Sequence, residues 1–552
     1  MTLRGRDRLS NRFLNKGTAF TADERDEYGL HGLIPPVIED LETQLLRVRV
    51  EFDAKATDIE RHIFLRLLQQ RSTVLFYRFV IDHLSELLPV IYTPTVGLAC
   101  QEWSRIYRRE HGLYVSLGDL GRVGQLLDNA MTSIQSVSVV VVTDGERVLG
   151  LGDLGVGGMG ISIGKLALYS AVGGLDPSRT LPILLDVGTD NESLLSDPLY
   201  LGRRHRRATR DQYDELVDEL VDALAQHCPG VLLQWEDLGQ RNAGRLLRRH
   251  RDRICSFNDD IQGTAAVASA AVIAGMQIAE EPIESLRAVI VGAGSAGMGI
   301  ADQLVATLVM RGVSETTARG QIWIVDRWGL LCQGQPELVP FQARFARGLA
   351  EVETWESDAE GQVNLVEVVR QVHPHALIGV TGQPGLFTED VVRAMGDAVL
   401  RPIIMPLSNP TVRSEALPED LIAWTGGRAL IGTGSPFGPV EHLGVSFDIA
   451  QVNNVSVFPG LGLGVVAARA TSVTAAMITA ASLAVADFAS ASDLIVLGRA
   501  PSLVPPIPQS RAVALAVAFA VARQAVRDGV APKADDEALL SIIDEVSWFP
   551  AY

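Results

Sequence analysis

Apolar residues recur at three- and four-residue spacing in three early segments, residues 41–52, 58–70 and 73–88. This period places the apolar side chains on one face of a helix, so each segment predicts an amphipathic helix. Pro35-Pro36 precedes the first segment and Pro89 follows the last, and proline commonly marks helix boundaries. We therefore predict a helical N-terminal domain over residues 1–112.

After residue 112, short apolar runs alternate with helical patterns. Residues 138–142 form a β-branched run that ends at the turn Asp144-Gly145, and residues 148–151 are a candidate hairpin partner for this strand. Alternating strands and helices indicate an α/β domain. We place this domain at residues 113–258 together with residues 454–530, the latter being mostly Ala-rich and helical.

The clearest supersecondary pattern begins at residue 288. An apolar strand, residues 288–291, leads into the turn Gly292-Ala293-Gly294-Ser295-Ala296-Gly297, which opens a predicted helix. A second strand then ends at Asp326. This order of strand, glycine turn, helix and strand is typical of a Rossmann-like doubly wound NAD(P)-binding domain. We assign residues 259–453 to it and leave residues 531–552 as a C-terminal tail.

The glycine turn suggests how a dinucleotide would bind. Gly292 would allow the tight turn, Gly294 would let a pyrophosphate approach the backbone, and Gly297 would let the helix pack closely on the strand. The carboxylate of Asp326 could accept both ribose hydroxyls and would repel a 2′-phosphate, which favours NAD. Arg327 could instead receive that phosphate, so NADP stays possible. The predicted cofactor contacts here are Gly292, Gly294, Ser295, Ala296, Gly297, Asp326 and Arg327.

Two acidic pairs lie beside ordered elements. Glu236-Asp237 follows the apolar run 231–235, and Asp259-Asp260 precedes a long apolar stretch. Crowded carboxylates repel one another unless a cation neutralises them, and oxygen ligands without nearby Cys or His suit Mg²⁺ or Mn²⁺. The alternative is that these acids only cap helices. Lys165, in an apolar setting that disfavours its charged form, is a candidate base, although such lysines more often snorkel to the surface.

Composition narrows the possible partners and locations. The 552 residues carry a formal net charge of −18, which disfavours nucleic acid and anionic membranes as partners. The basic run 203–207 lacks interleaved aromatics and is interpreted as a loop. Four scattered cysteines without CxxC spacing fit a reducing cytoplasm. Residues 263–279 are uncharged but short for a membrane span, so we predict a buried helix there and no transmembrane segment.

Several longer motifs resemble those of the malic enzymes and occur in the order of that family. They are GLHGLIPP (29–36), IYTPTVG (91–97), TDGERVLG (143–150), GDLG (152–155), LDVGTDN (185–191), FNDDIQGT (257–264), SNPT (408–411) and NNVSVFPG (453–460). The resemblance implies oxidative decarboxylation of (S)-malate to pyruvate and CO₂ with reduction of NAD(P)⁺. It also assigns substrate and metal binding to the α/β domain, and implies a homodimer or homotetramer.

The resemblance also assigns roles to individual residues. Glu236, Asp237 and Asp260 would be the metal ligands, and Asp259 would tune the catalytic lysine. Lys165 would be the base and Tyr92 the acid that protonates carbon 3. The residues implied to hold the malate carboxylates are Arg147, Asn409 and Asn454, and Asn409 would also contact the cofactor. Two alternatives remain open: a malolactic enzyme, which retains its NADH and releases lactate, and a non-catalytic NAD- or malate-binding regulator.

Overall fold

The computed structural model describes residues 2–131, 136–335, 338–491 and 502–552. The chain forms two compact units. The first contains Met1–Phe257, Val465–Ser472 and Val530–Tyr552, and the second contains Asn258–Gly464 and Val473–Gly529. Most of the Ala-rich segment that we grouped with the first α/β domain thus lies in the second unit. The division into three domains and a tail stays a prediction.

The predicted helical character of the N-terminal region is confirmed. Its main helices are α3 (Leu41–Asp53), α4 (Asp58–Arg71), α5 (Thr73–Asp82), α6 (Leu84–Ile91) and α7 (Thr95–Gln101). Helix α4 starts at a reciprocal cap in which the Thr57 hydroxyl accepts from the Glu60 N–H and the Glu60 carboxylate accepts from the Thr57 N–H. The expected single segment 73–88 is divided because His83 leaves the helical conformation, and Pro89 lies inside α6.

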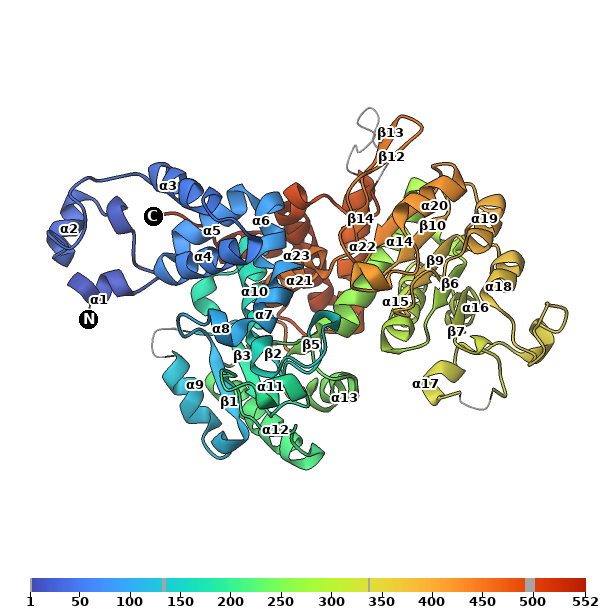
Figure 1. Ribbon diagram of the computed structural model, residues 1–552, viewed down its shortest axis with the longest axis horizontal. Coiled ribbons are helices and arrows are strands. Elements are labelled where there is room, and N and C mark those ends of the chain that lie inside the picture. The colour runs from blue at the N-terminus through green and yellow to red at the C-terminus, as the bar shows by residue number, and fades with distance from the viewer. Residues whose placement is uncertain (1, 132–135, 336–337, 492–501) are drawn as a thin grey trace. The chain divides into compact units, whose positions relative to one another are not determined.

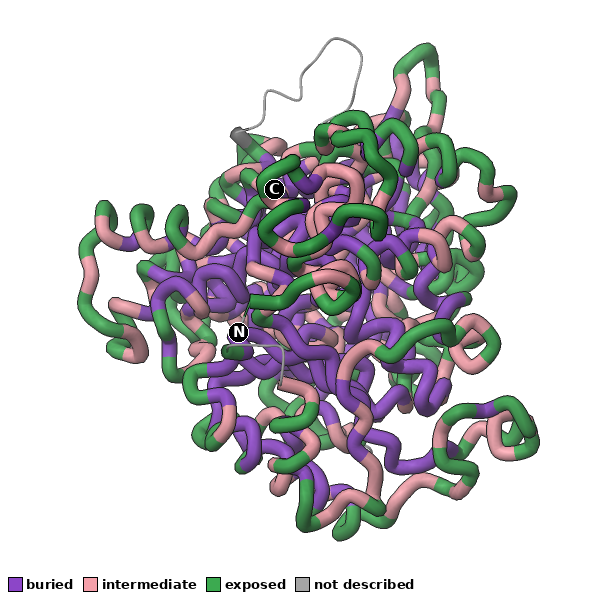
Figure 2. Tube along the Cα trace, turned by 90° about the vertical axis from the view of Figure 1, so that its left-hand side faces the viewer, coloured by how far each residue is buried: buried purple, intermediate pink, exposed green. Residues whose placement is uncertain are grey.

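The first unit is built on a five-stranded sheet in the order β1-β3-β2-β4-β5. The strands are β1 (Leu113–Ser116), β2 (Val139–Thr143), β3 (Thr180–Asp186), β4 (Leu232–Trp235) and β5 (Ser256–Asn258). Every residue of β2, β3 and β4 is buried. Figure 2 colours the chain by burial, with buried residues in purple. Such strands read as continuous apolar runs because both faces of a parallel sheet are covered. Helices α10 (Met159–Ala171), α12 (Arg210–His227) and α13 (Gln240–His250) connect strands of this sheet.

The hairpin expected after β2 is wrong. Strand β2 pairs in parallel with β3 on one side and with β4 on the other, so it has no free edge for an antiparallel partner. The segment Val148–Gly150 is instead a short 3-10 turn. The apolar composition of this segment resembles that of a strand, but β3 and β4 occupy both positions next to β2.

The second unit contains a seven-stranded sheet in the order β14-β11-β10-β9-β6-β7-β8. The strands are β6 (Ala288–Val291), β7 (Ile322–Asp326), β8 (Gly329–Leu330), β9 (Ala376–Gly379), β10 (Ile403–Pro406), β11 (Leu430–Thr433) and β14 (Ala450–Gln451). All neighbours pair in parallel except β7 and β8. The chain leaves β6 toward β7 on one side and later returns to β9 on the other. This reversal defines the switch point of a doubly wound fold, and the predicted Rossmann-like architecture is confirmed.

The uncharged stretch near residue 270 is a core helix of the second unit. Helix α14 (Thr264–Ile278) continues from a π-helical turn, Asp259–Gly263, and packs against α15 (Ser295–Met310) and α22 (Ala475–Ala491). Asp259–Ile278 is long and apolar enough to cross a membrane, yet 72% of its most apolar window is buried inside the protein. The Ser482 hydroxyl donates to the Ala266 carbonyl at 2.9 Å, which ties α22 to α14. The predicted buried helix is therefore confirmed.

Candidate functional site

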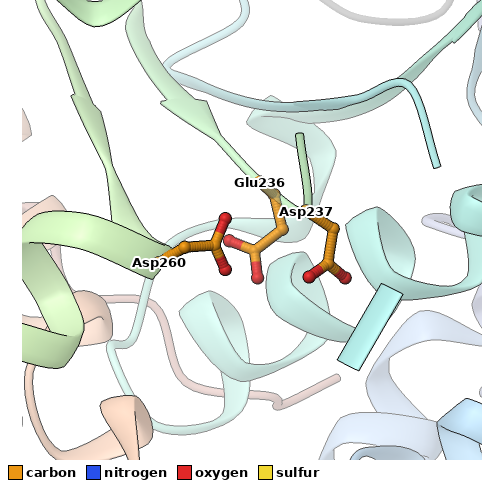
Figure 3. Close-up of side chains that lie close together, drawn as sticks. All are labelled: Glu236, Asp237 and Asp260. Atoms are coloured by element: carbon orange, nitrogen blue, oxygen red, sulfur yellow. The ribbon is translucent and has the colours of Figure 1, made fainter. Parts of the chain in front are cut away.

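The two acidic pairs follow neighbouring strands of the first sheet. Glu236 and Asp237 come directly after β4, and Asp259 and Asp260 come directly after β5. The two strands are joined by a hydrogen bond from the Leu233 N–H to the Cys255 carbonyl at 2.9 Å. Glu236, Asp237 and Asp260 each offer a carboxylate oxygen, and these oxygens lie within 4.8 Å of one another (Figure 3). Three of the four acids that we proposed from the two pairs thus lie close together.

The donor set fits a hard divalent cation. Glu236 and Asp237 are only 2% and 5% exposed, so their charges are poorly solvated and repel each other. The group consists of carboxylates without His or Cys, which is the ligand chemistry of Mg²⁺ or Mn²⁺. Burial, and secondarily the charge of Asp237, raises the pKa of the Cys100 thiol, so this nearby sulfur stays protonated and is a poor metal ligand.

The backbone around Asp237 is shaped to hold its side chain. Asp237 has φ of 50°, in the left-handed region that few residues other than glycine adopt. The loop after β2 stabilises this conformation, because the Arg147 N–H donates to the Asp237 carbonyl at 3.2 Å and the Leu149 N–H donates to its Oδ1 at 3.4 Å. Strain of this kind persists only where surrounding contacts fix it, and it is common at functional sites. The exposed side chain of Arg147 belongs to the same loop.

Lys165 lies in the interior next to this cluster, in the middle of α10. Its side chain is 2% exposed, and its Nζ lies 3.0 Å from Glu236 Oε1. The same Nζ lies 5.5 Å from the centroid of the Tyr92 ring. A surface-seeking lysine is therefore excluded. Burying an amine beside a carboxylate costs desolvation free energy, and ionisable groups in such surroundings are common at functional sites. Lys165 and Glu236 are therefore candidates for proton transfer.

Small residues on α10 bring Tyr92 close to Lys165. A Cβ on Gly164 would lie 3.3 Å from the Ile91 carbonyl oxygen, and a Cβ on Gly160 would lie 2.7 Å from Cys100 Sγ. Larger side chains at these two positions would push α10 away from the segment that carries Tyr92. The glycines in the sequence after residue 151 therefore act through helix packing as well as through turns.

One of the two asparagines that we predicted in the second unit contacts Asp259. Asn454 donates from Nδ2 to the Asp259 carbonyl at 3.1 Å and to Asp259 Oδ2 at 3.0 Å. A Cβ on Gly263 would lie 1.9 Å from Asp259 Oδ1, so only glycine fits in this turn. Asn409 is placed differently: it is exposed, and its Oδ1 accepts a hydrogen bond from the Ser435 hydroxyl at 2.5 Å.

The glycine turn after β6 has the geometry expected of a dinucleotide site. Gly292 has φ of 114°, and a Cβ on Gly297 would lie 1.9 Å from the Gly292 carbonyl oxygen, so both positions require glycine. A Cβ on Gly294 would meet no atom within 4 Å, which leaves the backbone open to a ligand. Ser295 begins α15, and the N-terminus of a helix favours a pyrophosphate.

The two residues proposed to discriminate the ribose follow at the end of β7. Asp326 is the last residue of β7 and is partly exposed, and its Oδ1 accepts the Arg327 N–H at 2.9 Å. The exposed Arg327 guanidinium lies 5.2 Å from the centroid of the Trp328 ring. The carboxylate therefore ends the strand where a ribose would lie in such a fold, and Arg327 has an aromatic neighbour.

Sequence reasoning missed a buried relay behind Glu236. The Tyr169 hydroxyl donates to Gln234 Oε1, and Gln234 Nε2 donates to Glu236 Oε2 at 2.6 Å. Gln234 is a fully buried polar residue within β4, and Tyr169 lies four positions after Lys165 on α10. Positions four apart share a helix face, so that spacing was the available signal. The relay fixes the orientation of the Glu236 carboxylate.

Comparisons with known proteins agree with these features. Residues 69–251 match a family profile described as malic enzyme, N-terminal domain, and residues 261–526 match one described as malic enzyme, NAD binding domain. The chain is 47% identical over 544 residues to an NAD-dependent malic enzyme of Vibrio parahaemolyticus, covering 99% of this chain and 96% of the relative. It is 48% identical over 539 residues to one of Acinetobacter baylyi, covering 98% and 94%.

Solved structures show the same architecture. A malic enzyme of Entamoeba histolytica superimposes with a TM-score of 0.56 at 22% identity, covering 94% of this chain and 91% of that one. An NAD-dependent malic enzyme of Thermotoga maritima superimposes with a TM-score of 0.51 at 25% identity, covering 79% and 92%. The likeness extends over most of both chains.

Proposed function

Since the chain belongs to the malic enzyme family, we propose that it catalyses the oxidative decarboxylation of (S)-malate to pyruvate and CO₂, with reduction of NAD⁺. The observation that carries this proposal is Lys165, buried with its Nζ 3.0 Å from Glu236 and next to the ring of Tyr92. Glu236, Asp237 and Asp260 would hold a Mg²⁺ or Mn²⁺ ion. When bound, this ion supplies Lewis-acid polarisation of the carbonyl and stabilises negative charge that develops on oxygen.

Lys165 is the residue that we propose accepts the proton of the malate hydroxyl. A base must lie within hydrogen-bonding reach of the proton that it takes, and Lys165 already contacts one of the proposed metal ligands. The burial of its side chain excludes bulk water, which would otherwise compete for the proton. Loss of the hydroxyl proton accompanies transfer of the carbon 2 hydride to NAD⁺.

Tyr92 is proposed to protonate carbon 3 after CO₂ departs. Its ring lies beside the Lys165 amine, so the two groups can exchange a proton without a long path. Asp259 is proposed as a positioning residue that tunes the lysine, and its bond with Asn454 fixes its orientation. Arg147, Asn409 and Asn454 are the residues proposed to bind the malate carboxylates, for which a guanidinium and amide N–H donors are suited.

NAD is proposed in preference to NADP. The carboxylate of Asp326 ends β7, where it would accept the ribose hydroxyls and repel a 2′-phosphate. The two relatives described above bear the name NAD-dependent malic enzyme, which supports the same choice. We propose that the pyrophosphate lies over the turn from Gly292 to Gly297 and contacts Ser295 and Ala296, with Asn409 contacting the cofactor as well.

The test is a coupled measurement of cofactor and product. With malate, Mn²⁺ and NAD⁺, absorbance at 340 nm should rise as pyruvate accumulates in equal amount, and replacing NAD⁺ by NADP⁺ should lower kcat/KM. Lactate formed without net NADH would replace the proposal with a malolactic reaction. Binding of NAD⁺ and malate without any turnover would instead indicate a regulator.

We extend the proposal to the location, the partners and the assembly of the enzyme. We propose that the protein works in the cytoplasm on a small-molecule substrate, as a homodimer or homotetramer and without nucleic acid or membrane as partner. The net charge of −18 supports the absence of polyanionic partners. Light scattering on the purified full chain measures the mass of the assembly, and the mass of a monomer would contradict the proposed oligomeric state.

A further inference from the structure

Glu415 is a fully buried acid of the second unit that connects the loops after two neighbouring strands. Its Oε1 accepts hydrogen bonds from the Thr381 N–H at 2.8 Å, from the Thr381 hydroxyl at 2.9 Å and from the Ser408 hydroxyl. Its Oε2 accepts the Ser408 N–H at 3.3 Å. Thr381 lies two residues after β9, and Ser408 lies two residues after β10. One carboxylate therefore holds the loop after β9 and the loop after β10 together.

The surroundings of this carboxylate supply hydrogen-bond donors and no cation. Its two oxygens offer about four acceptor sites, which these N–H and hydroxyl groups occupy. Among the described residues, no lysine, arginine or histidine forms an ion pair with Glu415. A Cβ on Gly379, the last residue of β9, would lie 2.7 Å from Glu415 Cδ, so the strand ends in glycine where the acid needs room. Because burying a carboxylate is costly unless it is hydrogen-bonded, the bonds to the two loops are what stabilise Glu415 at this position.

The loop after β9 lies against the glycine turn that is proposed to hold the pyrophosphate. The Val380 N–H donates to the Val291 carbonyl at 2.9 Å, and a Cβ on Gly292 would lie 3.0 Å from the Val380 carbonyl oxygen. Strand β9 is also the neighbour of β6 at the switch point of the sheet. The position of this loop therefore defines one side of the proposed dinucleotide site.

The loop after β10 is joined to the loop after β9. The Gly382 N–H donates to Ser408 Oγ at 2.8 Å, and the Ser408 hydroxyl in turn donates to Glu415. Asn409, which is proposed to contact the cofactor, follows Ser408 directly. Glu415 is buried, so its effect on Asn409 passes through Ser408.

The order of the strands indicates which half of NAD these loops would face. Asp326, the proposed ribose contact, ends β7 on one side of β6, and β9 and β10 lie on the other side. A dinucleotide in a doubly wound fold extends across the switch point. With the adenosine at the end of β7 and the pyrophosphate over the glycine turn, the nicotinamide would extend over the loops after β9 and β10.

We propose that Glu415 is a positioning residue for the nicotinamide half of NAD, which it orders by fixing residues 380–382 and 407–409. The inference rests on the proposed function, to which it adds a residue that acts through these two loops. Loops that are already ordered bind a ligand more tightly, because less conformational freedom is lost on binding. An ordered nicotinamide also favours hydride transfer, since the reaction requires a defined distance and orientation.

Glu415→Gln is the most specific variant because it keeps the shape of the side chain. The two backbone donors face different oxygens, with the Thr381 N–H at Oε1 and the Ser408 N–H at Oε2. A backbone N–H in an ordered loop cannot turn away, so the NH₂ group of glutamine faces a donor in either orientation. Ser408→Ala is a milder second variant, because it removes the hydroxyl that links the loops and leaves the other donors to Glu415 in place.

Calorimetry with NAD⁺ and with ADP-ribose, which lacks the nicotinamide, separates positioning from stability. In the full chain without malate or metal, both variants should bind NAD⁺ more weakly, by about tenfold for Glu415→Gln, and should bind ADP-ribose like the wild type. Gly294→Ala is the opposite reference and should weaken both ligands, since both carry the pyrophosphate. With malate and Mn²⁺ present, kcat should fall in both loop variants because the nicotinamide is less well oriented.

Glu367→Gln is the matched control in the same unit. Glu367, near the start of α18 (Leu365–Val372), is also buried, and its Oε1 accepts the Glu356 N–H at 3.1 Å and the Gln371 amide at 2.8 Å. This variant should lower Tm and leave the affinity for both ligands unchanged. Unchanged NAD⁺ affinity in Glu415→Gln and Ser408→Ala, or an equal loss of affinity for NAD⁺ and ADP-ribose, would overturn the inference alone. A wild-type chain that binds no NAD⁺ would overturn the proposed function and this inference with it.

Discussion

The two units carry parallel sheets, yet they present different chemistry at the ends of their strands. Charged side chains gather after β4, in the first unit, and after β5, where the second unit begins, and Lys165 of the first unit is buried beside Glu236. In the second unit, the loop after β6 offers backbone: glycines that leave N–H groups and a helix N-terminus accessible. The acidic cluster thus offers side-chain groups, whereas the glycine turn offers backbone groups that no side chain covers.

This difference separates two kinds of dependence on sequence. Side-chain chemistry requires particular functional groups and tolerates backbone variation, whereas backbone recognition requires that certain positions have no Cβ. Substitutions in the first unit should therefore remove chemistry and leave nucleotide binding, and substitutions in the glycine turn should do the reverse. The predictions below test this separation.

The largest effect is expected for Lys165→Ala. Turnover should fall by about 10²- to 10⁴-fold, the range that positioned acid–base groups contribute. NAD⁺ affinity, measured by calorimetry, should stay unchanged because the glycine turn belongs to the other unit. Lys533→Ala, at an exposed lysine, is the matched control. Normal turnover in Lys165→Ala would remove this residue from the mechanism.

Asp260→Ala should weaken Mn²⁺ binding and remove metal-dependent activity. One of three converging carboxylates is lost, while the Lys165–Glu236 pair stays in place. Mn²⁺ binding is followed by electron paramagnetic resonance, and a drop of at least tenfold in affinity is expected. Asp252→Ala, at a side chain that is 88% exposed, serves as the control. An unchanged Mn²⁺ affinity in Asp260→Ala would contradict its role as a ligand.

Two substitutions in the glycine turn should separate ligand approach from folding. Gly294→Ala has room for its methyl group, so Tm should hold while NAD⁺ affinity falls about tenfold. Gly297→Ala places its methyl group 1.9 Å from a backbone carbonyl, so Tm should fall, by an overpacking cost of about 1–3 kcal/mol. Gly320→Ala, which meets no atom within 4 Å, is the control for both. Equal Tm values for the Gly294→Ala and Gly297→Ala variants would break the comparison.

The predictions from sequence were most accurate where the local pattern and the tertiary context agree. The turn from Gly292 to Gly297 was predictable because strand, glycine spacing and helix all occur within one short segment. The buried helix near residue 270 was predictable because it has no charge. The segment Val148–Gly150 was misread because strand propensity is local, whereas the two neighbours of β2 come from distant parts of the chain.

The candidate metal site also shows that a local sequence pattern does not reveal which distant segments lie next to each other. The acidic pairs were visible as pairs, but only the order β4-β5 in the sheet explains why they meet. The burial of Lys165 could not be read from its neighbours, since an apolar setting also suits a snorkelling lysine. The roles of Tyr92, Arg147, Asn409 and Asn454 came from family resemblance alone and stay predictions.

The smallest effect is expected for Tyr169→Phe, which tests the relay behind Glu236. Without the hydroxyl, Gln234 loses the donor to its Oε1 and can rotate away from Glu236. A net hydrogen bond contributes about 0.5–1.5 kcal/mol, which corresponds to a loss of roughly two- to tenfold in Mn²⁺ affinity. Tyr169 reaches Glu236 through Gln234, so the expected role is positioning, and Mn²⁺ affinity is the readout that a purely structural role would leave unchanged.

Tyr213→Phe is the matched control for this last substitution. Its hydroxyl also donates a buried hydrogen bond to a side chain, Asp144 Oδ2 at 2.7 Å, but Asp144 is not one of the proposed ligands. Both variants should lower Tm by a similar amount, because each loses one buried hydrogen bond. Only Tyr169→Phe should weaken Mn²⁺ binding. If the two variants bind Mn²⁺ equally well, the hydroxyl of Tyr169 only stabilises the fold and does not contribute to metal binding.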